Sequence, residues 1–313
     1  MTISELRERL IPQLEGSSFA GNTYIVGGAV RDHLLGRKHI WDFDLTVELP
    51  NGGIKLGKWL RGHGDCLSDR VNKVFGTVRL DYDDFCLDLN GTRKEQYTKK
   101  AGYPVISYGN LLDDVMRRDF TINAIGEDFS GNICDPHGGI RDLRAGLLRA
   151  VGPGFAEDPL RVLRAVQFAA RFDLKLDPGT SVLCKSLLPE FSTLPVERIW
   201  TEWEKWAALA QRPSAGLQVL LQTGWIEAFP EILAMVGLPQ DPVWHPEGDV
   251  FTHTLHTCDA AAMLAAREHL DRPNRVLLLL ASLAHDFGKA TTTVRNAEGR
   301  WTSPRHDKEG VPL

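Results

Sequence analysis

The chain has 313 residues, enough for two or three domains of roughly 100 to 200 residues, each able to bury its own core. Hydrophobic residues make up 43%, and no apolar run reaches the roughly 18 residues of a membrane-spanning helix, which excludes an integral membrane protein. The formal net charge of −5 argues against a basic protein that coats nucleic acid. Because the first residues lack the apolar segment of a signal peptide, we expect a cytoplasmic protein with no membrane partner.

The amino-terminal part of the chain is predicted to be an α/β unit. Runs rich in β-branched and aromatic residues predict strands at 24–26, 43–47, 78–82 and 85–89, with the last two joined as a hairpin. After about residue 140, apolar residues recur at helical spacing, and the chain is predicted to be helical almost to its end. The five cysteines are far apart and never in Cys-x-x-Cys spacing, so we expect reduced, ordinary core residues.

A strand, two glycines and a helix follow one another at residues 24–35. Gly27 and Gly28 let the backbone approach a ligand closely, and the start of the helix, with Arg31, suits a phosphate chain. The same pattern also occurs in many tight turns that bind nothing. By itself it therefore leaves both interpretations open.

Three acidic residues follow on predicted strands. Asp42 and Asp44 are two apart, so both point to one side of their strand, and Asp88 lies within an otherwise apolar strand. Carboxylates are the ligands that Mg²⁺ prefers, and three of them at a phosphate site are typical of two-metal nucleotidyl transfer. The alternative for an isolated Asp-x-Asp is a solvated strand end.

Two further segments carry polar residues suited to a nucleotide. Arg117 and Arg118 can bind phosphate oxygens, while Asp119 and Asn123, four apart on a predicted helix, can hydrogen-bond a ribose hydroxyl. The alternative is a charged helix start capped by Asp119.

Asp158 and Arg161 are three apart on a predicted helix and could read a base. The aspartate offers a hydrogen-bond acceptor and the arginine offers donors to the edge of C or A, whereas U or G would leave these polar groups unpaired. The alternative is that Asp158 caps the helix and Arg161 is solvated.

Four ordered motifs resemble those of the bacterial class II tRNA nucleotidyltransferases, the CCA-adding enzymes that share their head with bacterial poly(A) polymerases. They lie at residues 27–44, 117–124, 135–143 and 157–165. Residues 244–253 and 284–289 resemble the HD domain of the multifunctional subgroup. The resemblance implies a polymerase-β-like α/β head with a mixed sheet, followed by an all-α neck, body and partial HD domain. We expect the head at 1–140, the neck and body at 141–240, and the HD part at 241–313.

The resemblance implies a template-independent enzyme that adds C, C and A to the tRNA 3′ end from CTP and ATP by two-metal transfer. Asp42, Asp44 and Asp88 would be catalytic, with Mg²⁺ on the first two. The implied nucleotide-binding residues are Gly27, Gly28, Arg31, Arg117, Arg118, Asp119, Asn123, Glu157, Asp158, Arg161 and Arg164. Residues 93–104 would correspond to the flexible loop that switches addition from C to A. Alternatives are CC-only or A-only addition, a poly(A) polymerase, or, in a different class, an HD-type phosphohydrolase acting on RNA ends or nucleotides.

The HD part is predicted to hold a divalent metal on His253, His285 and Asp286, with His256 or His306 as further candidates. The family pattern has another aspartate downstream, which this sequence lacks, so we expect an incomplete HD domain. The oligomeric state is left open by the sequence.

Overall fold

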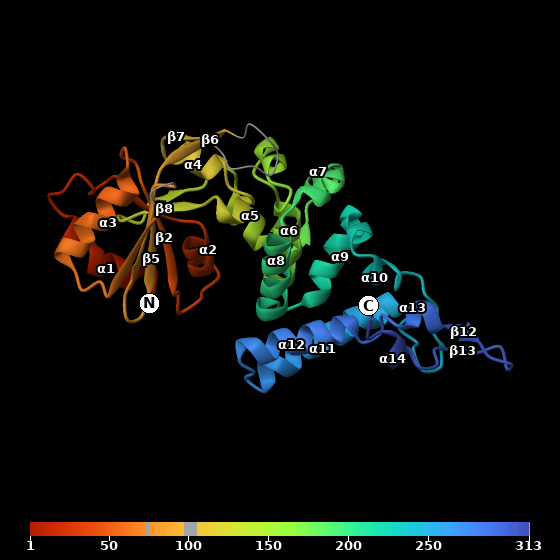
Figure 1. Ribbon diagram of the computed structural model, residues 1–313. Coiled ribbons are helices and arrows are strands. Elements are labelled where there is room, and N and C mark those ends of the chain that lie inside the picture. The colour runs from red at the N-terminus through yellow and green to blue at the C-terminus, as the bar shows by residue number, and fades with distance from the viewer. Residues whose placement is uncertain (73–74, 97–104, 313) are drawn as a thin grey trace. The chain divides into compact units, whose positions relative to one another are not determined.

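The computed structural model describes residues 1–72, 75–96 and 105–312, which form two compact units, Met1–Asp158 and Pro159–Leu313 (Figure 1). Across these residues we find no helix with the length and apolar character needed to cross a membrane. The three-part division expected from the sequence stays a prediction.

A mixed sheet forms the centre of the first unit, as predicted. In the described residues its seven strands lie in the order β3 (Ser68–Asn72), β4 (Thr77–Asp81), β5 (Cys86–Gly91), β2 (Asp42–Val47), β1 (Thr23–Val26), β8 (Gly126–Asp128) and β9 (Ile133–Cys134). The strand β2 pairs in parallel with β5 and antiparallel with β1. The predicted strands are confirmed as β1, β2, β4 and β5, and the predicted hairpin is the antiparallel pair β4–β5.

The first unit contains five α-helices among its described residues. They are α1 (Ile3–Leu14), α2 (Gly28–Leu34), α3 (Gly52–His63), α4 (Leu111–Met116) and α5 (Gly139–Arg144), and a separate hairpin joins β6 (Arg93–Gln96) to β7 (Val105–Tyr108). Of these helices, α2 and α3 pack on strands of the sheet. Phe43, Leu45 and Val47 on β2 are fully buried in the core that also contains the apolar side of α1. A Cβ on Gly57 would lie 2.8 Å from Val78 Cγ1, so only glycine lets α3 pack this closely on β4.

The second unit is helical, which confirms the predicted fold class. Its helices are α6 (Arg161–Phe172), α7 (Pro178–Ser186), α8 (Val196–Leu209), α9 (Pro213–Thr223), α10 (Pro230–Leu233), α11 (Val250–Arg267), α12 (Arg272–Ala284), α13 (Lys289–Thr292) and α14 (His306–Glu309). Short strands β12 (Val294–Arg295) and β13 (Trp301–Thr302) form a hairpin between α13 and α14. Asp249 caps α11 by accepting from the Thr252 backbone N–H at 2.8 Å, which fixes where the helix carrying His253 begins.

Candidate active site and metal centre

The three predicted catalytic carboxylates lie on adjacent parallel strands. Side chains alternate along β2, so Phe43 and Leu45 enter the core while Asp42 and Asp44 point to the other face. Asp44 is the direct register partner of Asp88 on β5. The structure thus brings Asp88 beside the pair that the sequence placed on one strand face.

An arginine that the sequence interpretation missed connects these carboxylates. Arg79 on β4 donates from Nη2 to Asp42 Oδ1 at 2.8 Å and from Nη1 to Asp88 Oδ2 at 2.7 Å. The register pairs Arg79 with Asp88 across the hairpin, so the predicted hairpin was the signal that could have identified it. Burial by itself lowers the pKa of Arg79, but the hydrogen bond to Asp42 and the charge of Asp88 raise it above its ordinary value.

The electrostatics of the carboxylates favour a bound cation. Burial raises the pKa of Asp44 above its ordinary value; the charge of Arg118 opposes this shift, and the charges of Asp88 and Asp42 add to it. Burial also raises the pKa of Asp88, although Arg79 acts in the opposite direction. A divalent cation would stabilise the ionised forms of Asp44 and Asp88, and carboxylate oxygens are the hard donors that such a cation prefers, so this set fits one.

A cavity opens beside Arg79 and Asp88. Its volume is about 590 Å³, and it is lined by Arg70, Val71, Asn72, Thr77, Arg79 and Asp88. This volume falls in the range of small-molecule sites, roughly 300 to 1,000 Å³. Asp88 therefore borders a space large enough for a nucleotide or an RNA end, and Arg79, which contacts both Asp42 and Asp88, lines it as well.

The glycine turn lies under one of the predicted arginines. Gly27 has φ +71°, and a Cβ there would lie 2.5 Å from Arg118 Nη1, so only glycine permits this approach. Arg31 on α2 is buried and donates from Nη1 to Asn123 Oδ1 at 2.5 Å and from Nε to Asp32 Oδ1 at 2.9 Å. Burial lowers the pKa of Arg31, although Asp32 opposes the shift.

The segment after Arg117 does not form the predicted helix. The helix α4 ends at Met116, and only a 3₁₀ turn follows at Thr121–Asn123. Asp119 and Asn123 nevertheless meet, because Asp119 Oδ1 accepts from Asn123 Nδ2 at 3.0 Å. The capping alternative is also wrong, since Phe120 precedes the 3₁₀ turn and no side chain caps it.

A buried aspartate that the sequence interpretation missed holds both arginines. Asp114 on α4 is fully buried and accepts from Arg117 Nη2 at 2.7 Å and from Arg118 Nη2 at 3.2 Å. Burial acts to raise the pKa of Asp114, but Arg118 and Arg117 together lower it below its ordinary value. The spacing of three and four residues from Asp114 to these arginines was the available signal, because such pairs meet on a helix.

The predicted base-reading residues lie around the boundary between the two units. Glu157 ends a 3₁₀ turn, Asp158 closes the first unit, and Arg161 begins α6 in the second. Leu160 rather than Asp158 is the N-cap, and Arg161 is buried, so the alternative of a cap and a solvated arginine is wrong. Arg164 lies one turn further along α6, with its guanidinium 5.2 Å from the centre of the Phe168 ring. Base reading stays a prediction, and loop residues 97–104 lie outside the described residues.

The second unit contains a histidine-rich cluster. His253 is on α11, whereas His285 and Asp286 follow the last residue of α12, in the turn before α13 and not on a helix as predicted. Their ligand atoms lie within 4.8 Å of one another, with His285 Nε2 3.2 Å from Asp286 Oδ2. His306 Nε2 lies 3.5 Å from Asp286 Oδ1, while the other candidate, His256, is exposed on α11.

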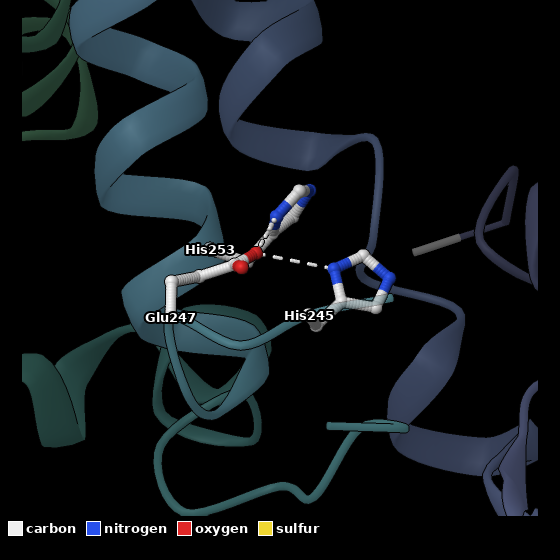
Figure 2. A group of neighbouring side chains, drawn as sticks. All are labelled: His245, Glu247 and His253. Carbon is white, nitrogen blue, oxygen red and sulfur yellow. Dashed lines mark hydrogen bonds and ion pairs between the residues drawn. The ribbon is translucent and has the colours of Figure 1, made fainter. Parts of the chain in front are cut away.

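Two residues from the preceding loop join this cluster, and the sequence interpretation did not assign them a role. Glu247 Oε1 lies 2.7 Å from His253 Nδ1 and 3.1 Å from His245 Nδ1 (Figure 2). Backbone hydrogen bonding and the His253 contact lower the pKa of Glu247 to about 2. Burial opposes ionisation of Asp286, but His285 and Lys289 lower its pKa below the ordinary value. These imidazoles and ionised carboxylates are donors that suit a transition metal.

Comparison with known protein families gives two matches along the chain. Residues 23–149 match the poly A polymerase head domain, and residues 250–313 match the HD domain. The chain is 38% identical over 285 residues to the multifunctional CCA protein of Neisseria meningitidis, covering 86% of this chain and 62% of that protein. It is 37% identical over 293 residues to the protein of the same name from Mannheimia succiniciproducens, and the match covers 86% of this chain and 63% of that protein. The chain thus spans less than two thirds of the length of these relatives.

Solved structures of enzymes of this kind are also similar to this chain. A tRNA nucleotidyltransferase in complex with a primer tRNA and an incoming ATP analogue has a TM-score of 0.62 at 28% identity, covering 90% of this chain and 75% of that chain. The Bacillus stearothermophilus CCA-adding enzyme in complex with CTP has a TM-score of 0.56 at 31% identity, and the match covers 71% of this chain and 52% of that chain.

Proposed function

We propose that the chain is a nucleotidyltransferase of the family that shares the poly(A) polymerase head domain, and that it adds C, C and A to the tRNA 3′ end from CTP and ATP. The observation that carries this proposal is that Asp42 and Asp44 on β2 lie beside Asp88 on β5, and that Asp88 lines a cavity of about 590 Å³. The names of the relatives and the tRNA, ATP and CTP in the similar structures support it. We place the reaction in the cytoplasm.

Nucleotidyltransferases of this family and HD domains generally use divalent metals, and in the head we assign Mg²⁺ to Asp42 and Asp44. When bound, the cation supplies charge stabilisation at the transferring phosphoryl group and lowers the pKa of the attacking hydroxyl. Asp88 adds a third negative charge opposite Asp44. Arg79 partly balances this charge, because it donates to both Asp42 and Asp88.

The residues around the glycine turn would bind the triphosphate and ribose. Arg118 lies directly over Gly27, and its position is fixed by buried Asp114. Arg31 and Asp119 both hold Asn123 through hydrogen bonds, which orients its amide without a large entropic cost on binding. We assign phosphate binding to Arg117 and Arg118, and ribose recognition to Asp119 and Asn123.

Nucleotide selection is assigned to Asp158 and Arg161, with Glu157 and Arg164 as neighbours. A carboxylate and a guanidinium complement the exocyclic amino group and ring nitrogen that C and A share. Opposite U or G the same groups would be left unpaired, at a cost of about 1 to 3 kcal/mol per buried group. The burial of Arg161 supports this assignment, because an unpaired guanidinium is costly only when it is shielded from water.

Incorporation assays separate this function from its alternatives. The chain is incubated with Mg²⁺, each labelled triphosphate, and tRNA ending at the discriminator base, in C or in CC, with Asp44→Asn as the inactive control. We expect C on the first two substrates and A on the third. Repeated A addition would indicate a poly(A) polymerase, and addition restricted to C or to A would indicate a partial enzyme. No incorporation on any tRNA would contradict the proposal.

The cluster of His253, His285 and Asp286 favours a second candidate activity, hydrolysis of a phosphate ester. A divalent metal on imidazole and carboxylate ligands activates water for such reactions. We expect phosphate release from RNA ends or nucleotides to persist in Asp44→Asn and to be lost in Asp286→Asn. Equal release by both variants and the unchanged chain would exclude this activity.

A further inference from the structure

The strand register places chemically distinct residues in one row across the sheet of the first unit. From the glycine turn outward, the successive register partners are Val26 on β1, Asp44 on β2, Asp88 on β5, Arg79 on β4 and Arg70 on β3. Direct register partners lie on the same face of a sheet, and neighbouring strands are about 4.8 Å apart. The row therefore runs from the residue before the glycine turn, across two carboxylates, to two arginines at the edge strand β3.

The two ends of this row are both cationic. At one end, Arg118 lies over Gly27, where we assign triphosphate binding. At the other end, Arg70 and Arg79 are direct cross-strand partners, and like charges in that position destabilise a sheet unless an anion compensates them. Asp81 supplies part of that compensation, because its Oδ2 accepts from Arg70 Nη2 at 3.2 Å and its Oδ1 accepts from Arg79 Nε at 3.2 Å. The carboxylates of the row thus lie between two sites that favour negative charge.

The cavity of about 590 Å³ lies at the arginine end of the row. Asn72 and Thr77 also line it, and they are direct register partners two positions along β3 and β4 from the two arginines. Side chains two apart on a strand share one face, so this part of the sheet presents a polar surface to the cavity. Among the described residues, the lining contains two guanidinium groups against one carboxylate, so it favours an anion.

Arg70 has hydrogen-bond donors for such an anion. Its side chain is 71% exposed, and its pair with Asp81 is the kind of surface ion pair that contributes little to stability, so a phosphate can compete for it. A planar guanidinium carries several N–H donors and can bind two phosphate oxygens at once. Because Asp81 and Asp88 offset part of the arginine charge, the single charge of a phosphodiester suits this end of the row better than a triphosphate does.

In-line phosphoryl transfer requires the attacking and leaving oxygens on opposite sides of the transferred phosphorus. With the triphosphate at the Gly27 end of the row, the attacking hydroxyl approaches from the arginine end. We propose that the cavity beside Asp88 receives the 3′-terminal nucleotide of the RNA, and that Arg70 binds the phosphate of that nucleotide, with Arg79 between this phosphate and the carboxylates. The assignment rests on the proposed nucleotide addition and names the place of the RNA end within it.

Paired changes in the protein and the RNA test this contact. The dissociation constant of labelled tRNA ending in C is measured by fluorescence anisotropy, with Mg²⁺ and without triphosphate, so the result does not depend on catalysis. The tRNA carries either the ordinary phosphate or an uncharged methylphosphonate before its last nucleotide. We expect Arg70→Gln or the methylphosphonate alone to weaken binding roughly 5- to 15-fold, and both together to weaken it no further than either one. Multiplication of the two effects would overturn the contact.

Controls separate this contact from structural effects and from catalysis. Arg70→Lys keeps the charge and should recover part of the affinity, whereas Arg61→Gln, which changes an exposed arginine paired with Asp69 at 2.9 Å, should bind as the unchanged chain does. Melting temperatures establish that each variant folds, and the KM for CTP should stay unchanged in Arg70→Gln. A raised KM for CTP with unaltered RNA affinity would put the triphosphate in this cavity and overturn the proposal. If the unchanged chain incorporated no nucleotide while the binding effects still failed to multiply, nucleotide addition would be contradicted and the site for the RNA end would stand.

Discussion

Asp44 on β2 and Asp88 on β5 are direct register partners in a parallel strand pair, although 44 positions separate them in the sequence. Burial is the main cause that raises the pKa of each carboxyl, and a neighbouring carboxylate adds to the shift in both cases: Asp88 for Asp44, and Asp42 for Asp88. An arrangement that disfavours the folded protein in the absence of a cation indicates a functional site.

The substitution Asp44→Asn should separate activity from stability. We expect loss of nearly all incorporation, because the amide cannot replace a carboxylate at the metal, while the melting temperature stays equal or rises since one of two repelling charges is removed. Single-turnover CTP incorporation and thermal denaturation without metal measure the two effects. Retention of more than about a tenth of the rate, roughly 1.4 kcal/mol of barrier, would contradict a role as metal ligand.

The substitution Arg79→Gln should make the head more dependent on metal. Arg79 donates to Asp42 and Asp88, so its removal leaves their repulsion uncompensated until a cation binds. We expect a lower melting temperature without Mg²⁺, a larger increase on adding Mg²⁺, and a lower half-saturating Mg²⁺ concentration. Arg61→Gln is the control, because the exposed side chain of Arg61 on α3 pairs at 2.9 Å with Asp69, away from the three carboxylates. The same Mg²⁺ response in both variants would show that Arg79 does not compete with the cation.

The buried carboxylate of Asp114 should make stability depend on pH. Its folded-state pKa lies below the ordinary value of 3.8, so the stabilisation is present above about pH 4 and is lost as the pH falls through the folded-state pKa. Asp114→Asn should cost about 3 kcal/mol at pH 7, because Arg117 and Arg118 lose a buried partner, and progressively less below pH 4. Urea denaturation from pH 3 to pH 7 measures the difference. A cost that is constant across this range would exclude the ion pairs as its source.

The substitution Arg161→Ala should relax the choice of nucleotide. If Asp158 and Arg161 contact the base edge, the rates with CTP and ATP fall while UTP and GTP compete better, by roughly 5- to 150-fold for 1 to 3 kcal/mol. Incorporation of all four triphosphates is compared with Arg171→Ala, which changes an arginine in the last turn of the same helix. An unaltered preference in a variant with a lowered melting temperature would mean that Arg161 has only a structural role.

The sequence by itself determined the features that depend on neighbours along the chain. Alternation on a strand places Asp42 and Asp44 on one face whatever the rest of the molecule does, and the Gly27–Gly28 turn between β1 and α2 follows from local backbone freedom. The order of the motifs was likewise sufficient to indicate the family. Where tertiary context overrides local preference, prediction from the sequence failed: the segment after Arg117 forms a 3₁₀ turn, with Asp119 bonded to Asn123.

Only the tertiary structure decided which distant groups meet. The parallel pairing of β2 with β5 sets Asp44 against Asp88, and the β4–β5 register then brings Arg79 to the same carboxylates. In the second unit, the packing of separate helices and loops directs Glu247 at His253 and His306 at Asp286. The periodicity of a sequence specifies the face of a helix or strand on which a side chain lies. Contact between remote segments depends instead on strand register and helix packing, and both of these are determined by the burial of the whole core.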